Sequence, residues 1–354
     1  MNRSKYWLSI LILTLLISSC SNMQVFHMDV LKPGYVVVPS QKNNIVLVDN
    51  SGVQPSYMGH EVKIGFKLIG DTSFNTEPLS ELLFGSLSNY LLKEGFYKRI
   101  TPWHRGTILP VKTKEGEYLR SGRISNSMIR EISRDTSVHL LISLDRLLTT
   151  TTTNTYYTGE TYLATRDVWV NSVWRVYDLD QDTLITQFQY NDSLYWQKNS
   201  QNPLKVTQSL PLIDDVLPEI GDVVAEHLSR VMGPHWESEK REYFCTGSYR
   251  MKMAADLVRN GSIDEAATLW KLEFEKGIFR SKYRAAMNMM FYEELKGNPA
   301  EALVWCKKAE EAMLQCPIGS ADYDVVYLNQ RKIALEDRVE DVQKLKIYFD
   351  GNLN

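Results

Sequence analysis

Near the middle of the chain lies the run Val138-His139-Leu140-Leu141-Ile142-Ser143-Leu144, in which five of the seven residues are large and apolar. A short run of this kind is typical of a strand that is buried on both faces of a sheet. The earlier run Ile45-Val46-Leu47-Val48 has the same character and ends at the turn residues Asn50-Ser51-Gly52. These two runs predict the buried centre of a sheet in the first half of the chain.

The segment between these two strands has the pattern of helices. Residues 76–95 carry leucines at helical spacing, with Thr76 as the cap and Pro78 in the first turn. Residues 96–100 then favour a short strand, and residues 125–135 favour a second helix. This alternation of strands and helices predicts an α/β arrangement.

The next segment is extended rather than helical. Residues 167–179 and 183–196 predict the two strands of a β-hairpin, and in the second strand Asp192 alone breaks the alternation of large and polar residues. Residues 149–153 favour a further antiparallel strand because threonine suits a pleated surface. We therefore expect an N-terminal α/β (α+β) domain with a mixed sheet over residues 45–236.

Beyond Trp236 the sequence favours helices alone. The segment Gly261-Ser262-Ile263-Asp264-Glu265-Ala266 recurs 36 residues later as Gly297-Asn298-Pro299-Ala300-Glu301-Ala302. Each copy holds a glycine that ends one helix and a residue that caps the next. The residues expected to pack where neighbouring helices meet are Ala266, Trp270, Ala302 and Cys306.

Helical hairpins with this period resemble tetratricopeptide repeats, which stack into a curved solenoid with a concave binding surface. The tryptophan and the tyrosine that mark the first helix of such repeats are missing here. The resemblance implies an all-α domain of TPR-like helical hairpins over residues 247–349.

The first twenty residues are laid out like a bacterial lipoprotein signal. Arg3 and Lys5 precede an apolar run over residues 6–17, and small residues lead to Cys20. The run is too short to cross a bilayer comfortably, which takes about twenty apolar residues. The resemblance implies a leader over residues 1–19, an acylated Cys20, and a tether with the first strand over residues 20–44. An ordinary signal peptide with a chance cysteine is the alternative.

The composition is that of a folded protein. The chain has 354 residues, of which 44% are hydrophobic and 23% are charged. The formal net charge is −3, and it is −5 without Arg3 and Lys5, which argues against a nucleic-acid partner. Besides Cys20 the chain has Cys245, Cys306 and Cys316, an odd number that cannot pair completely. A bridge between Cys306 and Cys316 stays open at this point.

The sequence presents no catalytic, cofactor or metal motif. Its six histidines are scattered, and no two have the spacing of metal ligands on a helix. The run Asp178-Leu179-Asp180-Gln181-Asp182 imitates the start of a calcium loop, but Thr183 stands where the loop requires glycine. Trp169, Trp174 and Trp196 could form a sugar-stacking platform, although cross-strand packing is the favoured interpretation.

Taken together, these features resemble a family of uncharacterised lipoproteins from the Bacteroidetes, a domain of unknown function (DUF6340) with a repeat-like helical tail. The residues that carry this resemblance include Pro234-His235-Trp236, Arg241-Glu242-Tyr243-Phe244, Ala285-Ala286-Met287-Asn288-Met289-Met290 and Glu294-Leu295-Lys296-Gly297. Through Leu91-Leu92-Lys93-Glu94-Gly95-Phe96, the first half also resembles outer-membrane accessory lipoproteins of the curli-secretion and cell-wall-synthase-activator kind. The family of unknown function supplies no activity to carry over.

The sequence thus favours a non-catalytic interaction or assembly module of the bacterial cell envelope. It would be held on a membrane, most simply the outer membrane, through Cys20, with a protein partner on the helical repeats. The stretch Ser21-Asn22-Met23-Gln24 lacks the acidic run that resembles surface-export signals, which favours the periplasmic face. The alternative function is that of a glycan-binding or glycan-processing protein, and the fold alone cannot decide between the two.

Overall fold

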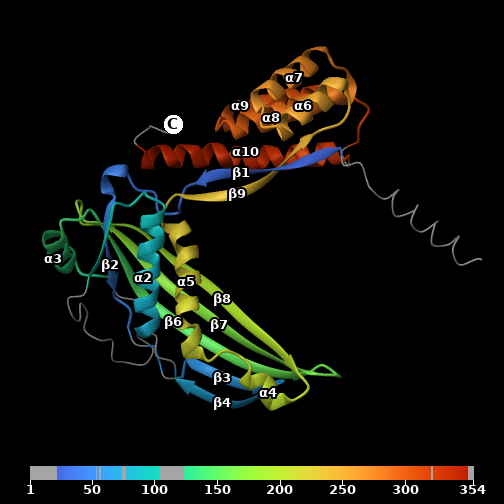
Figure 1. Cartoon of the computed structure of the whole chain (residues 1–354). Coiled ribbons are helices and arrows are strands. Elements are labelled where there is room, and N and C mark those ends of the chain that lie inside the picture. The colour runs from blue at the N-terminus through green and yellow to red at the C-terminus, as the bar shows by residue number, and fades with distance from the viewer. Residues whose placement is uncertain are drawn as a thin grey trace, which may run out of the picture. The chain divides into compact units, whose positions relative to one another are not determined.

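The computed structural model describes residues 22–52, 54–55, 57–73, 77–103, 123–319 and 322–349 (Figure 1). The chain divides into two compact units. The sheet unit comprises Pro33–His235 with Lys344–Asn354, and the helical unit comprises Met1–Lys32 with Trp236–Gln343. Cys20 and Thr76 lie outside the described residues. Within those residues, no helix is long and apolar enough to span a membrane.

The sheet unit is built on a mixed sheet that has seven strands over the described residues. The strands are β2 (Asn44–Asp49), β3 (Gly59–Ile64), β4 (Lys67–Ser73), β5 (Arg99–Trp103), β6 (Leu140–Tyr157), β7 (Tyr162–Asp178) and β8 (Thr183–Ser200). Strand β6 is central, and β7 and β8 extend the sheet from it in antiparallel order. Its other edge pairs in parallel with β2 near the start and with β3 near the end. Outside these strands lie β5, parallel to β2, and β4, antiparallel to β3.

Helices cover both faces of this sheet. They are α2 (Glu77–Lys93), α3 (Asn126–Thr136), α4 (Pro203–Gln208) and α5 (Ile213–Met232), and a 3-10 turn forms at Ser40–Lys42. Helices α2 and α5 lie side by side on one face (Figure 1), so close that a Cβ added to Gly221 would stand 3.1 Å from the Leu82 Cβ. On that face Phe84 meets the fully buried Trp174 edge to face at 5.9 Å. On the opposite face Ile129 and Ile132 of α3 pack with the central strands.

The helical unit begins with a strand pair. Strand β1 (Met23–Lys32) pairs with β9 (His235–Phe244) in a two-stranded sheet. The helices that follow are α6 (Tyr249–Arg259), α7 (Ile263–Lys276), α8 (Phe279–Leu295), α9 (Pro299–Met313) and α10 (Tyr323–Tyr348). The helix starts and stops around Gly261 and Gly297 therefore fall where the sequence predicts them. Over residues 323–348 the chain forms one uninterrupted helix rather than a hairpin.

The predicted fold class is confirmed, since an N-terminal α/β part with a mixed sheet precedes a region of several helices. Two details differ. The expectation that only helices follow Trp236 is wrong over β9, and the predicted strands 138–144 and 149–153 are parts of one strand, β6. A bulge between Leu144 and Arg146 lies where the apolar pattern is interrupted.

The bulge is the site of a buried carboxylate. Asp145 is 1% exposed and accepts hydrogen bonds from the Ser143 hydroxyl at 2.6 Å, from the Asn50 amide and from Arg175. Burial raises the pKa of Asp145, although these three partners act in the opposite direction. Two of the partners are distant in sequence, so the local pattern could not indicate why a charge stands inside a buried strand.

The core of the helical unit contains the residues at equivalent positions of its two similar segments. Ala266, Trp270, Ala302 and Cys306 are all fully buried in one cluster, in which the Trp270 ring lies 6.3 Å from that of Phe291. Burial raises the pKa of the Cys306 thiol to about 11, so this thiol stays protonated at neutral pH. Cys245, Cys306 and Cys316 form no disulfide with one another, which closes the question of a Cys306–Cys316 bridge.

The repeat interpretation predicts that Ala266→Leu and Ala302→Leu each lower the melting temperature. The added atoms would overpack a fully buried position, which typically costs about 1–3 kcal/mol. The matched controls are Lys271→Leu and Lys307→Leu, which place the same side chain on exposed positions of α7 and α9. If all four variants melt together in a thermal scan, the two alanines do not act as close packing contacts between helices.

Candidate functional site

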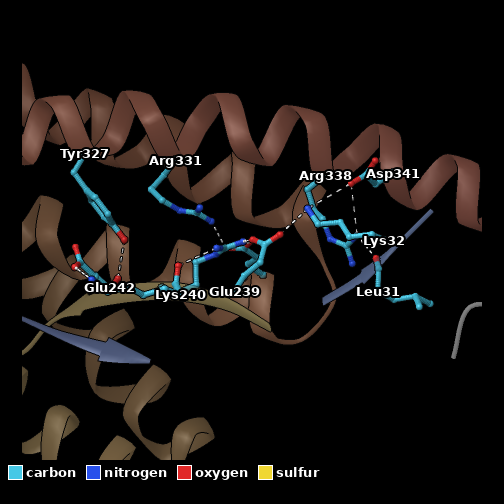
Figure 2. A network of polar contacts seen from close by, with 11 residues as sticks. Leu31, Lys32, Glu239, Lys240, Glu242, Tyr327, Arg331, Arg338 and Asp341 are labelled. Carbon is cyan, nitrogen blue, oxygen red and sulfur yellow. Dashed lines mark hydrogen bonds and ion pairs between the residues drawn. The ribbon is translucent and has the colours of Figure 1, made fainter. Parts of the chain in front are cut away.

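A row of charged side chains runs through the helical unit (Figure 2). Glu294 on α8 joins its two halves, because arginines from two other elements bond to it. Arg241 of β9 donates from Nε to both carboxylate oxygens of Glu294 at 3.0 Å, and Arg331 of α10 also donates to it. Glu294 is 5% exposed. Burial alone would raise its pKa, but Arg241 and Arg331 outweigh burial and hold the pKa of Glu294 below the ordinary value. The carboxylate therefore stays charged in the interior.

The row continues along the two strands toward the later turns of α10. Lys32 lies 2.6 Å from Glu239 and 3.7 Å from Asp341, and Glu239 also bonds to Arg241. Arg338 donates to the backbone of Leu31. Figure 2 shows these side chains between α10 and the strands β1 and β9. Because each of these charges meets an opposite charge or a carbonyl, this row holds α10 on the strand pair.

A polar pocket of about 430 Å³ lies at the start of strand β1. It is lined by Asn22, Met23, Glu242, Phe244, Arg280, Arg284, Asp322, Tyr323 and Asp324. Arg280 pairs with Asp322 at 2.8 Å, and Arg284 pairs with Asp324 at 2.7 Å. Both arginines are thus neutralised by the protein itself, so the pocket offers little attraction to an anion.

An apolar cleft of about 360 Å³ opens at the end of α9, and we call it the α9–α10 cleft. Its lining consists of Glu310, Met313, Leu314, Cys316, Ile318, Gly319, Val325, Leu328 and Asn329. Leu314 is 87% exposed at its mouth. Glu310 on the rim pairs with Lys332 at 2.8 Å. An apolar floor with a polar rim is the arrangement found at the centres of protein interfaces.

In the sheet unit, a polar pocket of about 330 Å³ contains His60 of β3. The imidazole bonds to the Thr151 hydroxyl and lies 3.5 Å from that of Thr153. Burial, aided by the charge of Arg166, lowers the pKa of His60, so the ring is neutral at pH 7. His60 is held by threonines rather than by carboxylates, which indicates a structural histidine.

The sheet unit also has an apolar end, which we call the apolar tip. A cleft of about 450 Å³ lies there. Its lining residues are Val62, Lys63, Ile64, Gly65, Ile69, Thr155, Tyr156, Tyr157, Tyr162, Pro203, Leu204 and Thr207. Phe66 at the turn is fully exposed, and Leu204 of α4 is 73% exposed. This surface was not predicted from the sequence, although the apolar turn Ile64-Gly65-Phe66 between two lysines is a signal that could have indicated it.

The tryptophans and the calcium-like turn do not form the binding sites that their sequences could suggest. Trp174 is fully buried while Trp169 is 58% exposed, so the tryptophans do not form an exposed row and the sugar-stacking platform is wrong. In the turn at 178–182, Asp178 and Asp180 both pair with Lys42, which gives these carboxylates a partner other than a metal. Among the described residues, no group of three or more His, Cys, Asp or Glu side chains could hold a metal ion.

Comparison with known proteins gives two family matches and no activity. The family model described as a domain of unknown function (DUF8603) matches residues 42–244, and a second domain of unknown function (DUF6340) matches residues 252–336. No curated protein matches the chain.

Solved structures show only a low likeness. The PelC dodecamer from Paraburkholderia phytofirmans is 10% identical with a TM-score of 0.23, covering 59% of this chain and 99% of its own. A putative neuraminyllactose-binding hemagglutinin homolog from Helicobacter pylori is 11% identical with a TM-score of 0.26. The match covers 55% of this chain and 87% of the hemagglutinin homolog. The LpoB C-terminal domain from Salmonella enterica is 9% identical with a TM-score of 0.19. The match covers 45% of this chain and 87% of the LpoB domain. None of these transfers a function to the chain.

Proposed function

The chain belongs to the DUF8603 family, a domain of unknown function, and we propose that it is a lipid-anchored, non-catalytic interaction module of the bacterial cell envelope. The leader-like residues 1–19 and Cys20 support the anchor. One acyl chain holds a protein on a membrane only marginally, whereas two or more hold it firmly. A multiply acylated Cys20 would therefore keep both units on the outer membrane, with the periplasmic face as the favoured side.

The observation that carries the interaction role is the α9–α10 cleft. Its volume suits one or two large apolar side chains, and the exposed Leu314 would be covered by a partner. We assign as its occupant a partner protein that inserts a leucine-, methionine- or phenylalanine-like side chain. Such buried apolar anchors, ringed by polar contacts, provide most of the energy of many interfaces.

The buried charges of the chain support this role over a catalytic one. A general acid or base must reach a bound substrate. Glu294 is enclosed between Arg241 and Arg331, and Asp145 is enclosed by Ser143, Asn50 and Arg175. These carboxylates thus hold protein groups in place.

Photo-cross-linking in the native envelope tests the docking role. A photoreactive residue at Leu314 of the full chain should give a discrete adduct with one protein, and the same probe at the exposed Lys307 of α9 should not. Adding Ile318→Asp makes the cleft polar without altering a fully buried position, and should remove the adduct. Identical adducts at both probe positions, or an adduct that survives Ile318→Asp, would contradict docking at the cleft.

A further inference from the structure

The turn between β3 and β4 presents its apolar residues on a fixed backbone. Gly65 adopts φ 60°, a left-handed conformation that glycine takes without strain. Its amide donates to the Thr155 carbonyl at 2.9 Å, and its own carbonyl accepts from the Asn154 amide at 3.1 Å. These two hydrogen bonds tie the turn to β6. Phe66, which follows Gly65, is therefore exposed on an ordered turn.

The side chains around this turn are aliphatic and aromatic together. Ile64 is 59% exposed, Phe66 is fully exposed, and Leu68 and Ile69 are about half exposed. Tyr157 of the neighbouring hairpin is also exposed and lies 5.0 Å from Tyr162, ring to ring. Exposed apolar groups gathered in this way mark an interaction surface on a soluble domain. Aliphatic side chains beside tyrosines are also the composition that settles at the boundary between lipid and water.

The charge around the apolar tip is opposite in sign to that of the chain. The segments 62–70, 154–165 and 196–208, which bring the lining residues together, contain four lysines and one carboxylate, Glu160. The lysines are Lys63, Lys67, Lys198 and Lys205. Glu61, just outside these segments, pairs with Lys63, and Asp71 lies opposite Glu61 on β4, so the positive charge of the tip rests on Lys67, Lys198 and Lys205. The whole chain has a formal net charge of −3, so the positive charge is a local property of this end of the sheet.

We propose that the apolar tip binds an anionic lipid surface, as a membrane contact of the sheet unit that is distinct from the acyl anchor. The projecting Phe66 would enter the headgroup region with Ile64 and Leu68, and the lysines would meet lipid phosphates. A protruding turn suits a bilayer surface better than a partner protein, because a partner would have to supply a matching hollow and carboxylates for the lysines. Each lysine near an anionic surface strengthens binding about fivefold at moderate salt.

Vesicle sedimentation tests this contact without the anchor. The mature chain is made from residue 20 with Cys20→Ser, and is mixed with vesicles of phosphatidylcholine alone or with phosphatidylglycerol added. We expect binding to the anionic vesicles. Phe66→Asp should weaken it at least about tenfold, since the burial of a large apolar side chain is lost. Lys67→Gln with Lys205→Gln should weaken it about thirtyfold and should matter little for neutral vesicles.

The matched control is Ile185→Asp, which places the same charge on a 40%-exposed residue at the other end of β8. It should bind like the parent, and circular dichroism should show all variants folded. Binding that is unchanged by Phe66→Asp, or absent with both vesicle types, would overturn the proposal. Association of the parent in sedimentation without vesicles, lost in Phe66→Asp, would identify a second copy as the occupant and would equally overturn it. The outcome is independent of adducts at Leu314, which test the proposed function.

Discussion

Replacement of Cys20 by alanine in the full chain is expected to move the protein from the membrane fraction to the soluble envelope fraction, or to leave its leader uncut. Burial of acyl chains stabilises attachment by about 0.8 kcal/mol per CH₂, so loss of the acylated residue removes nearly all of the anchoring energy. The measurement is membrane fractionation with a salt wash, because salt screens any lysine contacts of the apolar tip. The mass of the protein shows whether the leader was removed.

The control for this variant is Cys316→Ala, which removes a thiol of the helical unit and should leave the protein on membranes. If the Cys20→Ala protein has lost its leader and still sediments with salt-washed membranes, anchoring through Cys20 is wrong.

The second large effect concerns Glu294. Glu294→Gln should lower the free energy of unfolding of the helical unit by about 3–5 kcal/mol, because the buried Arg241 and the largely enclosed Arg331 would lose their shared carboxylate. The control is Asp256→Asn on α6, whose ion pair with Arg259 is exposed and should contribute less than about 1 kcal/mol. Urea unfolding followed by circular dichroism compares the two. Equal midpoints for both variants would show that the buried pairs do not hold α10 in place.

The pH dependence of the same residue has a defined sign. Since the pKa of Glu294 is lowered in the folded protein, its contribution to stability is complete above the ordinary carboxyl value of 4.5. It is lost as the pH falls through the lowered pKa. The parent should therefore lose its advantage over Glu294→Gln only in acid, below about pH 4.5.

The elements that could be predicted are those with a signal in their own residues. The strands that contain Ile45 and Leu140 are buried on both faces, so their sequences are continuous apolar runs that predict a strand without knowledge of their partners. Strand β8 of the predicted hairpin alternates as expected, whereas β7 is buried without interruption from Ser172 to Asp178. The exception at Asp192 is explained by its polar partners. Asp192 accepts hydrogen bonds from the Tyr190 hydroxyl at 2.9 Å and from His227 of α5 at 2.8 Å, so it satisfies polar groups beneath the helix.

The elements that were missed depend on partners far away in the sequence. The first seven residues of strand β9, His235-Trp236-Glu237-Ser238-Glu239-Lys240-Arg241, have no apolar face, and only Tyr243 and Phe244 at its end enter the core. This part of the strand is ordered by pairing with β1 and by the ion pair between Arg241 and Glu294. The same reason explains the candidate sites. Cys20 stands in a local motif, whereas the α9–α10 cleft and the apolar tip exist only after distant segments meet.

The most direct test of the lipid-anchored module is the mass of the N-terminal peptide of the mature protein, taken from its own membranes. We predict a peptide that begins at Cys20 and carries a diacylglyceryl group on the sulfur, with or without a further acyl chain on the amine. A peptide that begins at another residue, or an unmodified Cys20 at the N-terminus, would contradict the anchor and with it the assignment of the chain as an envelope lipoprotein.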